Sequence, residues 1–133
     1  MADPGDIEQT RAGFEALAER GVDAMLEYVH PEFEMETLPG IAAEPQVYRG
    51  HDGVRRWFDS FYEVMDEVRI EPTAYEPIEP GRVLMEFRMA AKGQASGIEV
   101  VQEAAAVATL EDGLMRRLEF LLPGQEPPQP APR

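Results

Sequence analysis

The chain has 133 residues, no cysteine and a formal net charge of −14. This length fits one domain with a buried core, and the lack of cysteine excludes a disulfide framework and thiolate-bound metal. The acidity opposes binding to a phosphate backbone, so we expect no nucleic-acid partner. No apolar run reaches the roughly 20 residues that span a bilayer, so we expect no membrane partner. The polar start is unlike a secretory signal, and we expect a cytoplasmic protein.

Two helices are predicted at the start of the chain. Residues Ala2 to Arg20 carry four side chains on one helical face, namely Ile7, Thr10, Phe14 and Leu17. Gly21 interrupts this helix, and Val22 to Val29 is expected to form a short second one. Pro31 ends it and favours an extended conformation at His30, because the residue before a proline avoids the helical region.

A strand and a loop follow. Residues Glu32 to Leu38 alternate between acidic and apolar side chains, with Phe33, Met35 and Thr37 on the apolar side. This alternation predicts a strand with one buried face. Residues Pro39 to Gln46 contain two prolines and a glycine and are predicted to form a loop.

The strongest helical pattern runs from Tyr48 to Met65 and opens with a turn at Arg49-Gly50. Its apolar residues recur at the spacing of a single helical face: Val54, Trp57, Phe58, Phe61 and Met65. Because this face holds the only tryptophan of the chain and two of its six phenylalanines, we expect the helix to supply much of the core.

Four strands are predicted after this helix, and they follow one another as a meander: Val68 to Tyr75, Arg82 to Lys92, Ile98 to Leu110 and Leu114 to Leu122. Pro72 marks the first of them as an edge strand or a bulge. Glycine-containing turns separate the strands, at Glu76 to Gly81, Gly93 to Gly97 and Glu111 to Gly113. Helices that precede an antiparallel sheet indicate the α+β class.

The end of the chain is predicted to lie outside the folded domain. Residues Pro123 to Arg133 contain five prolines, and a segment of this composition cannot join a sheet or build a core. We therefore expect a single domain over residues 1–122 and a disordered tail over residues 123–133.

Four short motifs resemble the SnoaL-like group of the nuclear transport factor 2-like superfamily. They are His30-Pro31-Glu32-Phe33, Tyr48-Arg49-Gly50 before Val54 to Phe58, the turn Gly93 to Gly97, and Glu111 to Leu114 before Leu118-Glu119-Phe120. The resemblance covers about residues 6 to 122 and implies a cone-shaped α+β barrel, a cystatin-like fold with three N-terminal helices packed on a curved, mostly antiparallel sheet. It also implies a homodimer and a hydrophobic small-molecule ligand bound in the cone.

Enzymes of this superfamily place polar residues deep in the cone. By resemblance to the ketosteroid isomerases, the catalytic tyrosine corresponds to Phe14, the carboxylate base to Thr37 beside Glu36, and the protonated acid to Glu103. Of these matched residues, only Glu103 has a side chain chemically similar to the catalytic group at its position, which makes it the candidate catalytic residue.

Two readings of Glu103 follow from the strand that carries it. Alternation places it on one face with Val101, Ala105 and Val107, where burial among apolar neighbours would favour a protonated acid able to exchange a proton. Alternatively, this face points to solvent, or Glu103 pairs with Arg88 or Arg117. The opposite face carries a row of alanines, Ala104, Ala106 and Ala108, and we expect a two-fold dimer to form through it.

The ligand-binding residues are expected among the large apolar side chains that the predicted elements turn inward: Phe14, Leu17, Phe33, Met35, Thr37, Trp57, Phe61, Phe87, Met89 and Phe120. Such side chains either line a ligand pocket or fill a solid core. No cofactor is expected, and His30 and His51 lack an evident third ligand for a metal site. The sequence thus predicts a small-molecule-binding domain, either a cofactor-free isomerase, cyclase or dehydratase or a non-catalytic binding or dimerisation module.

Overall fold

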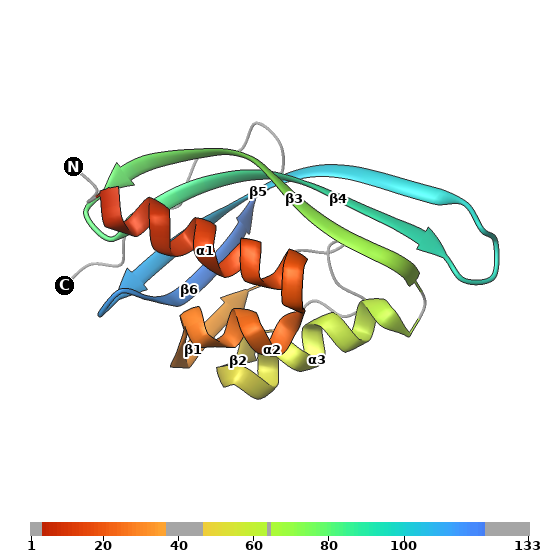
Figure 1. The fold of residues 1–133 in the computed structure, drawn as a ribbon, viewed down its shortest axis with the longest axis horizontal. Helices are drawn as coiled ribbons and strands as arrows, with labels where there is room; N and C mark the ends of the chain where they lie inside the picture. Colours follow the sequence, from red (N-terminus) through yellow and green to blue (C-terminus); the bar gives the residue numbers. More distant parts are fainter. Residues whose placement is uncertain (1–3, 37–46, 64, 122–133) are drawn as a thin grey trace.

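Three helices pack on a six-stranded sheet in the computed structural model, which describes residues 4–36, 47–63 and 65–121 (Figure 1). The helices are α1 (Pro4–Arg20), α2 (Val22–Met25) with the 3-10 turn η1 (Leu26–Tyr28), and α3 (Gly50–Tyr62). The strands are β1 (Val29–Glu36), β2 (Val47–Arg49), β3 (Met65–Glu79), β4 (Arg82–Gly93), β5 (Glu99–Glu111) and β6 (Leu114–Leu121). No helix within these ranges is long and apolar enough to cross a membrane.

The strands follow the order β2-β1-β6-β5-β4-β3 in one mixed, open sheet. Strands β1 and β6 run parallel, and the other neighbours are antiparallel. This arrangement confirms the α+β class and the mostly antiparallel sheet under three helices. It also confirms β3 as an edge strand, with a register shift at Pro72.

The central helix is shorter than predicted at both ends. Tyr48 and Arg49, which were expected to open the helical stretch with a turn at Arg49-Gly50, instead form strand β2 together with Val47, because these three residues pair with Glu34 to Glu36 of β1. Helix α3 begins at Gly50, where φ is 69°, and ends at Tyr62, so Met65 belongs to β3. The predicted tail and Thr37 lie outside the described residues.

The core lies between the helices and the inner face of the sheet. The prediction for β4 is confirmed, since Val83, Met85, Phe87 and Met89 are all buried. Trp57 of α3 is 2% exposed; its ring stacks on Phe120 with centroids 5.6 Å apart and meets Phe58 edge-on at 4.7 Å.

The alanine row of β5 faces the core, contrary to the prediction, while on the other face Val101 and Glu103 are exposed and only Val107 is buried as predicted. Ala104, Ala106 and Ala108 belong to the buried core cluster, so the alanine row is no outer surface for a partner. The reason lies in the neighbouring strands, where bulky side chains stand beside each alanine: Phe87 pairs with Ala104 and Phe120 with Ala106. Small residues on the central strand leave room for these large ones.

Helix α1 is fixed to the sheet at its start and along its side. The backbone N–H of Gly81, in the turn between β3 and β4, donates to Asp6 Oδ2 at 3.1 Å. Arg11 lies over the ring of Tyr75, 5.2 Å from its centroid, and burial raises the pKa of Tyr75 to about 12, so this phenol is neutral at physiological pH.

Gly53 is expected to be intolerant of a side chain. A Cβ there would lie 2.9 Å from the backbone carbonyl carbon of Tyr48, so α3 and β2 would have to separate. We expect Gly53→Ala to lower the free energy of unfolding by about 1–3 kcal/mol, measured by urea denaturation. The matched control is Gly13→Ala, also within a helix, whose Cβ would meet the flexible end of Met115 and lie 3.3 Å from Tyr28 Cβ without touching the backbone of another element. Equal losses in the two variants would contradict this packing.

Candidate functional site

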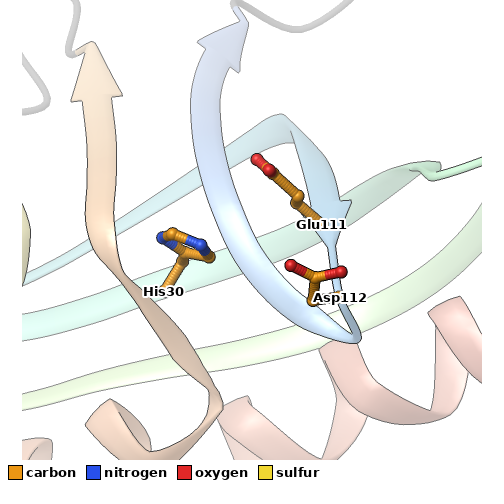
Figure 2. A group of neighbouring side chains, drawn as sticks. All are labelled: His30, Glu111 and Asp112. Atoms are coloured by element: carbon orange, nitrogen blue, oxygen red, sulfur yellow. The ribbon is translucent and has the colours of Figure 1, made fainter.

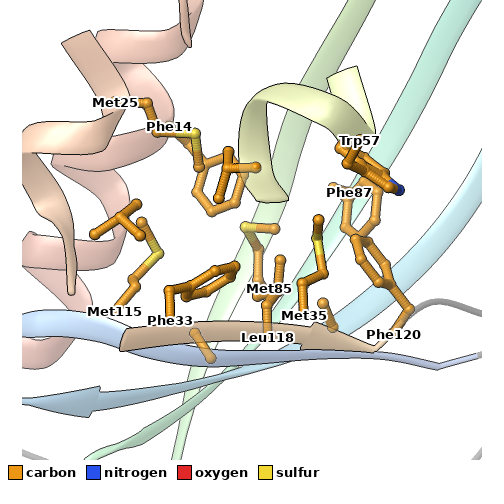
Figure 3. Packing of buried hydrophobic residues seen from close by; sticks show 14 of the residues in the cluster. Phe14, Met25, Phe33, Met35, Trp57, Met85, Phe87, Met115, Leu118 and Phe120 are labelled. Carbon is orange, nitrogen blue, oxygen red and sulfur yellow. The ribbon is translucent and has the colours of Figure 1, made fainter. Parts of the chain in front are cut away.

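The core encloses an apolar cavity of about 20 Å³. Figure 3 shows side chains from the helices and from the sheet converging around it. Among the described residues, every lining side chain is apolar: Phe14, Met25, Val29, Phe33, Met35, Val54, Trp57, Phe58, Ile70, Met85, Phe87, Met115, Leu118 and Phe120. An apolar lining offers no hydrogen-bond partner to a water molecule, so the cavity stays dry.

Six of the residues predicted to contact a ligand line this cavity: Phe14, Phe33, Met35, Trp57, Phe87 and Phe120. Leu17 packs at the edge of the core and Met89 within it, and neither lines the cavity. Thr37 and the side chain of Phe61 lie outside the described part of the chain. That any of these residues contacts a ligand stays a prediction.

The sequence did not predict the remaining lining residues as ligand contacts, although most of them lie on a face that its pattern marks as apolar. Val54 and Phe58 share the apolar face of α3 with Trp57, and Met85 shares the buried face of β4 with Phe87. The alternation of β6 marks Met115 and Leu118 less clearly, because a register shift between β5 and β6 interrupts the pairing there.

A second, larger hollow lies beside the cavity, and we name it the α1–α3–β3 groove. Its volume is about 350 Å³, and its lining residues come from those three elements: Leu17, Ala18, Phe58, Tyr62, Val68, Arg69, Ile70 and Glu71. Phe58 and Ile70 also line the core cavity. These two side chains therefore form the wall between the cavity and the groove.

The expected placement of Glu103 inside the cone is wrong. Its side chain is 75% exposed, and its Oε1 lies 3.4 Å from Arg88 Nη2 on the neighbouring strand. The physical reason is that the alanines of β5 occupy the inner face of the strand, which places Glu103 on its outer face. The structure thus matches the alternative in which Glu103 faces solvent and pairs with Arg88.

Removing the charge of Glu103 is expected to have little effect. An exposed ion pair contributes ~0–1 kcal/mol, so Glu103→Gln should change the free energy of unfolding by no more than that and should leave ligand affinity unchanged. Urea denaturation and calorimetric titration check the two parts. A large loss of affinity would mean that Glu103 reaches the ligand after all.

One side-chain cluster has the composition of a metal site. His30, Glu111 and Asp112 gather where β1 begins and β5 turns into β6 (Figure 2), and one potential ligand atom from each lies within 4.8 Å of the others. The backbone N–H of Glu32 donates to His30 Nδ1 at 3.0 Å, so the neutral ring carries its proton on Nε2. That nitrogen can donate to a carboxylate but offers no lone pair to a cation, and we assign no metal to the cluster.

Several solved structures share this fold. TerC, co-crystallised with polyporic acid, is 21% identical with a TM-score of 0.76, covering 89% of this chain and 91% of that chain. A nuclear transport factor 2-like protein from Burkholderia pseudomallei is 16% identical with a TM-score of 0.78, covering 90% and 92%. A Mycobacterium tuberculosis protein in complex with estradiol-17beta-hemisuccinate is 9% identical with a TM-score of 0.73, covering 89% and 93%. At these identities the likeness establishes the fold.

A family match extends this likeness to the sequence. No curated protein matches the chain, whereas the SnoaL-like domain matches residues 10–118. The match runs from the middle of α1 into β6 and so includes all the elements that build the cavity and the groove. The chain therefore belongs to the SnoaL-like domain family.

Proposed function

We propose that this protein binds a small hydrophobic molecule in its core cavity and takes it up through the α1–α3–β3 groove. The observation that carries the proposal is a fully apolar cavity separated from an open groove by Phe58 and Ile70. The cavity is small without a ligand, but four methionines line it: Met25, Met35, Met85 and Met115. Methionine side chains are flexible and adapt to irregular shapes, so their rearrangement provides room for the ligand.

The same lining favours a binding function over acid/base catalysis. An isomerase, cyclase or dehydratase needs a group that holds or moves a proton at the ligand. None of the described residues that line the cavity has a titratable side chain. The ligands of TerC and of the mycobacterial protein are small organic molecules, which supports the class of ligand proposed here.

A variant that fills the passage tests the proposal. Ile70→Trp places a larger side chain between the groove and the cavity, and we expect it to weaken the binding of octanol at least tenfold in isothermal titration calorimetry. The matched control is Ile78→Trp on the same strand, where the side chain is 38% exposed and away from the cavity; it should bind octanol like the unmodified protein. Failure of octanol to bind the unmodified protein would refute the proposal.

We further propose a homodimer in the cytoplasm, although the buried alanines cannot form its interface. Support for another interface comes from the far end of the β4–β5 hairpin, where Ile98 and Val101 are 64% and 54% exposed, since exposed apolar groups often mark association sites. Light scattering should give the mass of two chains, and Ile98→Ser with Val101→Ser should give the mass of one. A single-chain mass for the unmodified protein would contradict the dimer.

A further inference from the structure

The α1–α3–β3 groove is lined by the carboxyl ends of two helices. Leu17 and Ala18 belong to the last turn of α1, and Tyr62 is the last residue of α3. Figure 1 shows both helix ends beside the first half of β3. The carboxyl end of a helix carries partial negative charge, so the two ends together favour a cation in the groove. This contribution is moderated because Leu17 O accepts from the N–H of Gly21 at 3.0 Å and Tyr62 O accepts from Gln94 Nε2 at 2.8 Å.

The charged side chains of the groove add to this preference. Glu71 lines the groove, and the one basic residue of the described lining, Arg69, is held by two carboxylates. Its Nε lies 3.7 Å from Glu71 Oε1 and its Nη2 lies 3.4 Å from Glu99 Oε1. Glu99 lies outside the groove lining, but its carboxylate shares the guanidinium with Glu71, so Glu71 is only partly neutralised. The net charge of −14 over the whole chain also attracts cations from a distance.

An aromatic surface completes the site. The rings of Phe58 and Tyr62 stack with centroids 6.3 Å apart, and Tyr62 is 46% exposed. A cation is attracted to the face of such a ring. Phe58 also borders the core cavity, so a molecule with its cationic group at Tyr62 can direct an apolar chain past Phe58 into the core.

We propose that the ligand is a hydrophobic amine, with its ammonium group in the α1–α3–β3 groove and its hydrocarbon part in the core cavity. This inference rests on the proposed function, because the hydrocarbon part uses the same cavity. The ammonium group lies between the two helix ends, Glu71 and the ring of Tyr62. A carboxylate in the same place would meet the negative charge of all these groups.

Three probes with the same hydrocarbon chain separate this inference from the proposed function: octylamine, octanol and octanoate. In calorimetric titrations we expect octylamine to bind about tenfold more tightly than octanol and octanoate to bind more weakly than either. The advantage of the amine should fall as the NaCl concentration rises, because salt screens partly exposed charges.

A variant that removes one negative charge from the groove tests where the preference for octylamine arises. Glu71→Gln should remove at least half of the advantage of octylamine while leaving octanol binding unchanged. Glu76→Gln is the matched control, since it removes the same charge from the same strand outside the groove. If octanol binds and octylamine gains nothing over it, or if both variants reduce the advantage equally, the inference is overturned while the proposed function stands. If none of the three probes binds, the proposed function is refuted, and the inference that rests on it is refuted as well.

Discussion

Replacing Trp57 with alanine is expected to lower the free energy of unfolding by about 3–5 kcal/mol, as truncation of a large buried aromatic residue leaves a cavity that its surroundings only partly fill. The indole contacts Phe58 on its own helix and Phe120 on β6. It therefore joins α3 to the sheet, and its loss should weaken the attachment of the helix as well as the core. Urea denaturation followed by circular dichroism measures the change.

The control for this variant is Tyr62→Ala, an aromatic truncation on the same helix. Because Tyr62 is half-exposed, we expect its loss to cost about 1 kcal/mol or less. Comparable losses in the two variants would contradict the inward orientation of Trp57 and with it the register of α3.

Replacing Phe58 with alanine is expected to have two effects. It should lower the free energy of unfolding by about 3–5 kcal/mol, because the side chain is buried. It should also join the core cavity to the α1–α3–β3 groove, since Phe58 forms half of the wall between them. We therefore expect octanol to associate faster with the variant, and to raise its melting temperature by binding only the folded state.

Phe33→Ala is the matched control for the second effect. Phe33 is equally buried and lines the cavity but not the groove, so its truncation should cost similar stability without opening the wall. Stopped-flow measurement of octanol association in the two variants tests the difference. Equal association rates would show that the ligand does not pass Phe58.

Most of the fold follows from local sequence patterns. The alternation in β4 and the helical spacing of Val54, Trp57 and Phe58 each identify an element and its buried face, because one face is clearly apolar and the other clearly polar. Strand β2 was missed for the opposite reason. Its three residues have no period of their own, and they form a strand because β1 offers a partner.

The faces of β5 could not be predicted from that strand alone. Val101 and Val107 are larger and more hydrophobic than the alanines that alternate with them, which favoured the face of Glu103 as the inner one. The correct side depends on Phe87 and Phe120 in the flanking strands, whose volume requires a small residue between them. Complementarity of volume across strands becomes visible only when the pairing is known.

Prediction of the site is likewise limited to features that do not depend on tertiary contacts. The apolar lining is predictable because residues that build the core also border the cavity. The groove is not predictable, since Tyr62, Arg69 and Glu71 come from a helix end and from an edge strand whose proximity is a tertiary property. The alternation of β5 pointed to Glu103, whereas the polar side chains of the groove are separated from the cavity only by Phe58 and Ile70.

Methionine-methyl NMR tests the central claim most directly, because the chain has seven methionines and four of them line the cavity. With methyl-labelled methionine, we predict that octanol shifts the signals of Met25, Met35, Met85 and Met115. The signals of Met65 and Met89, which lie outside the lining, serve as internal references and should move little. Binding of octanol that leaves the four cavity signals unchanged would contradict a ligand site in the core.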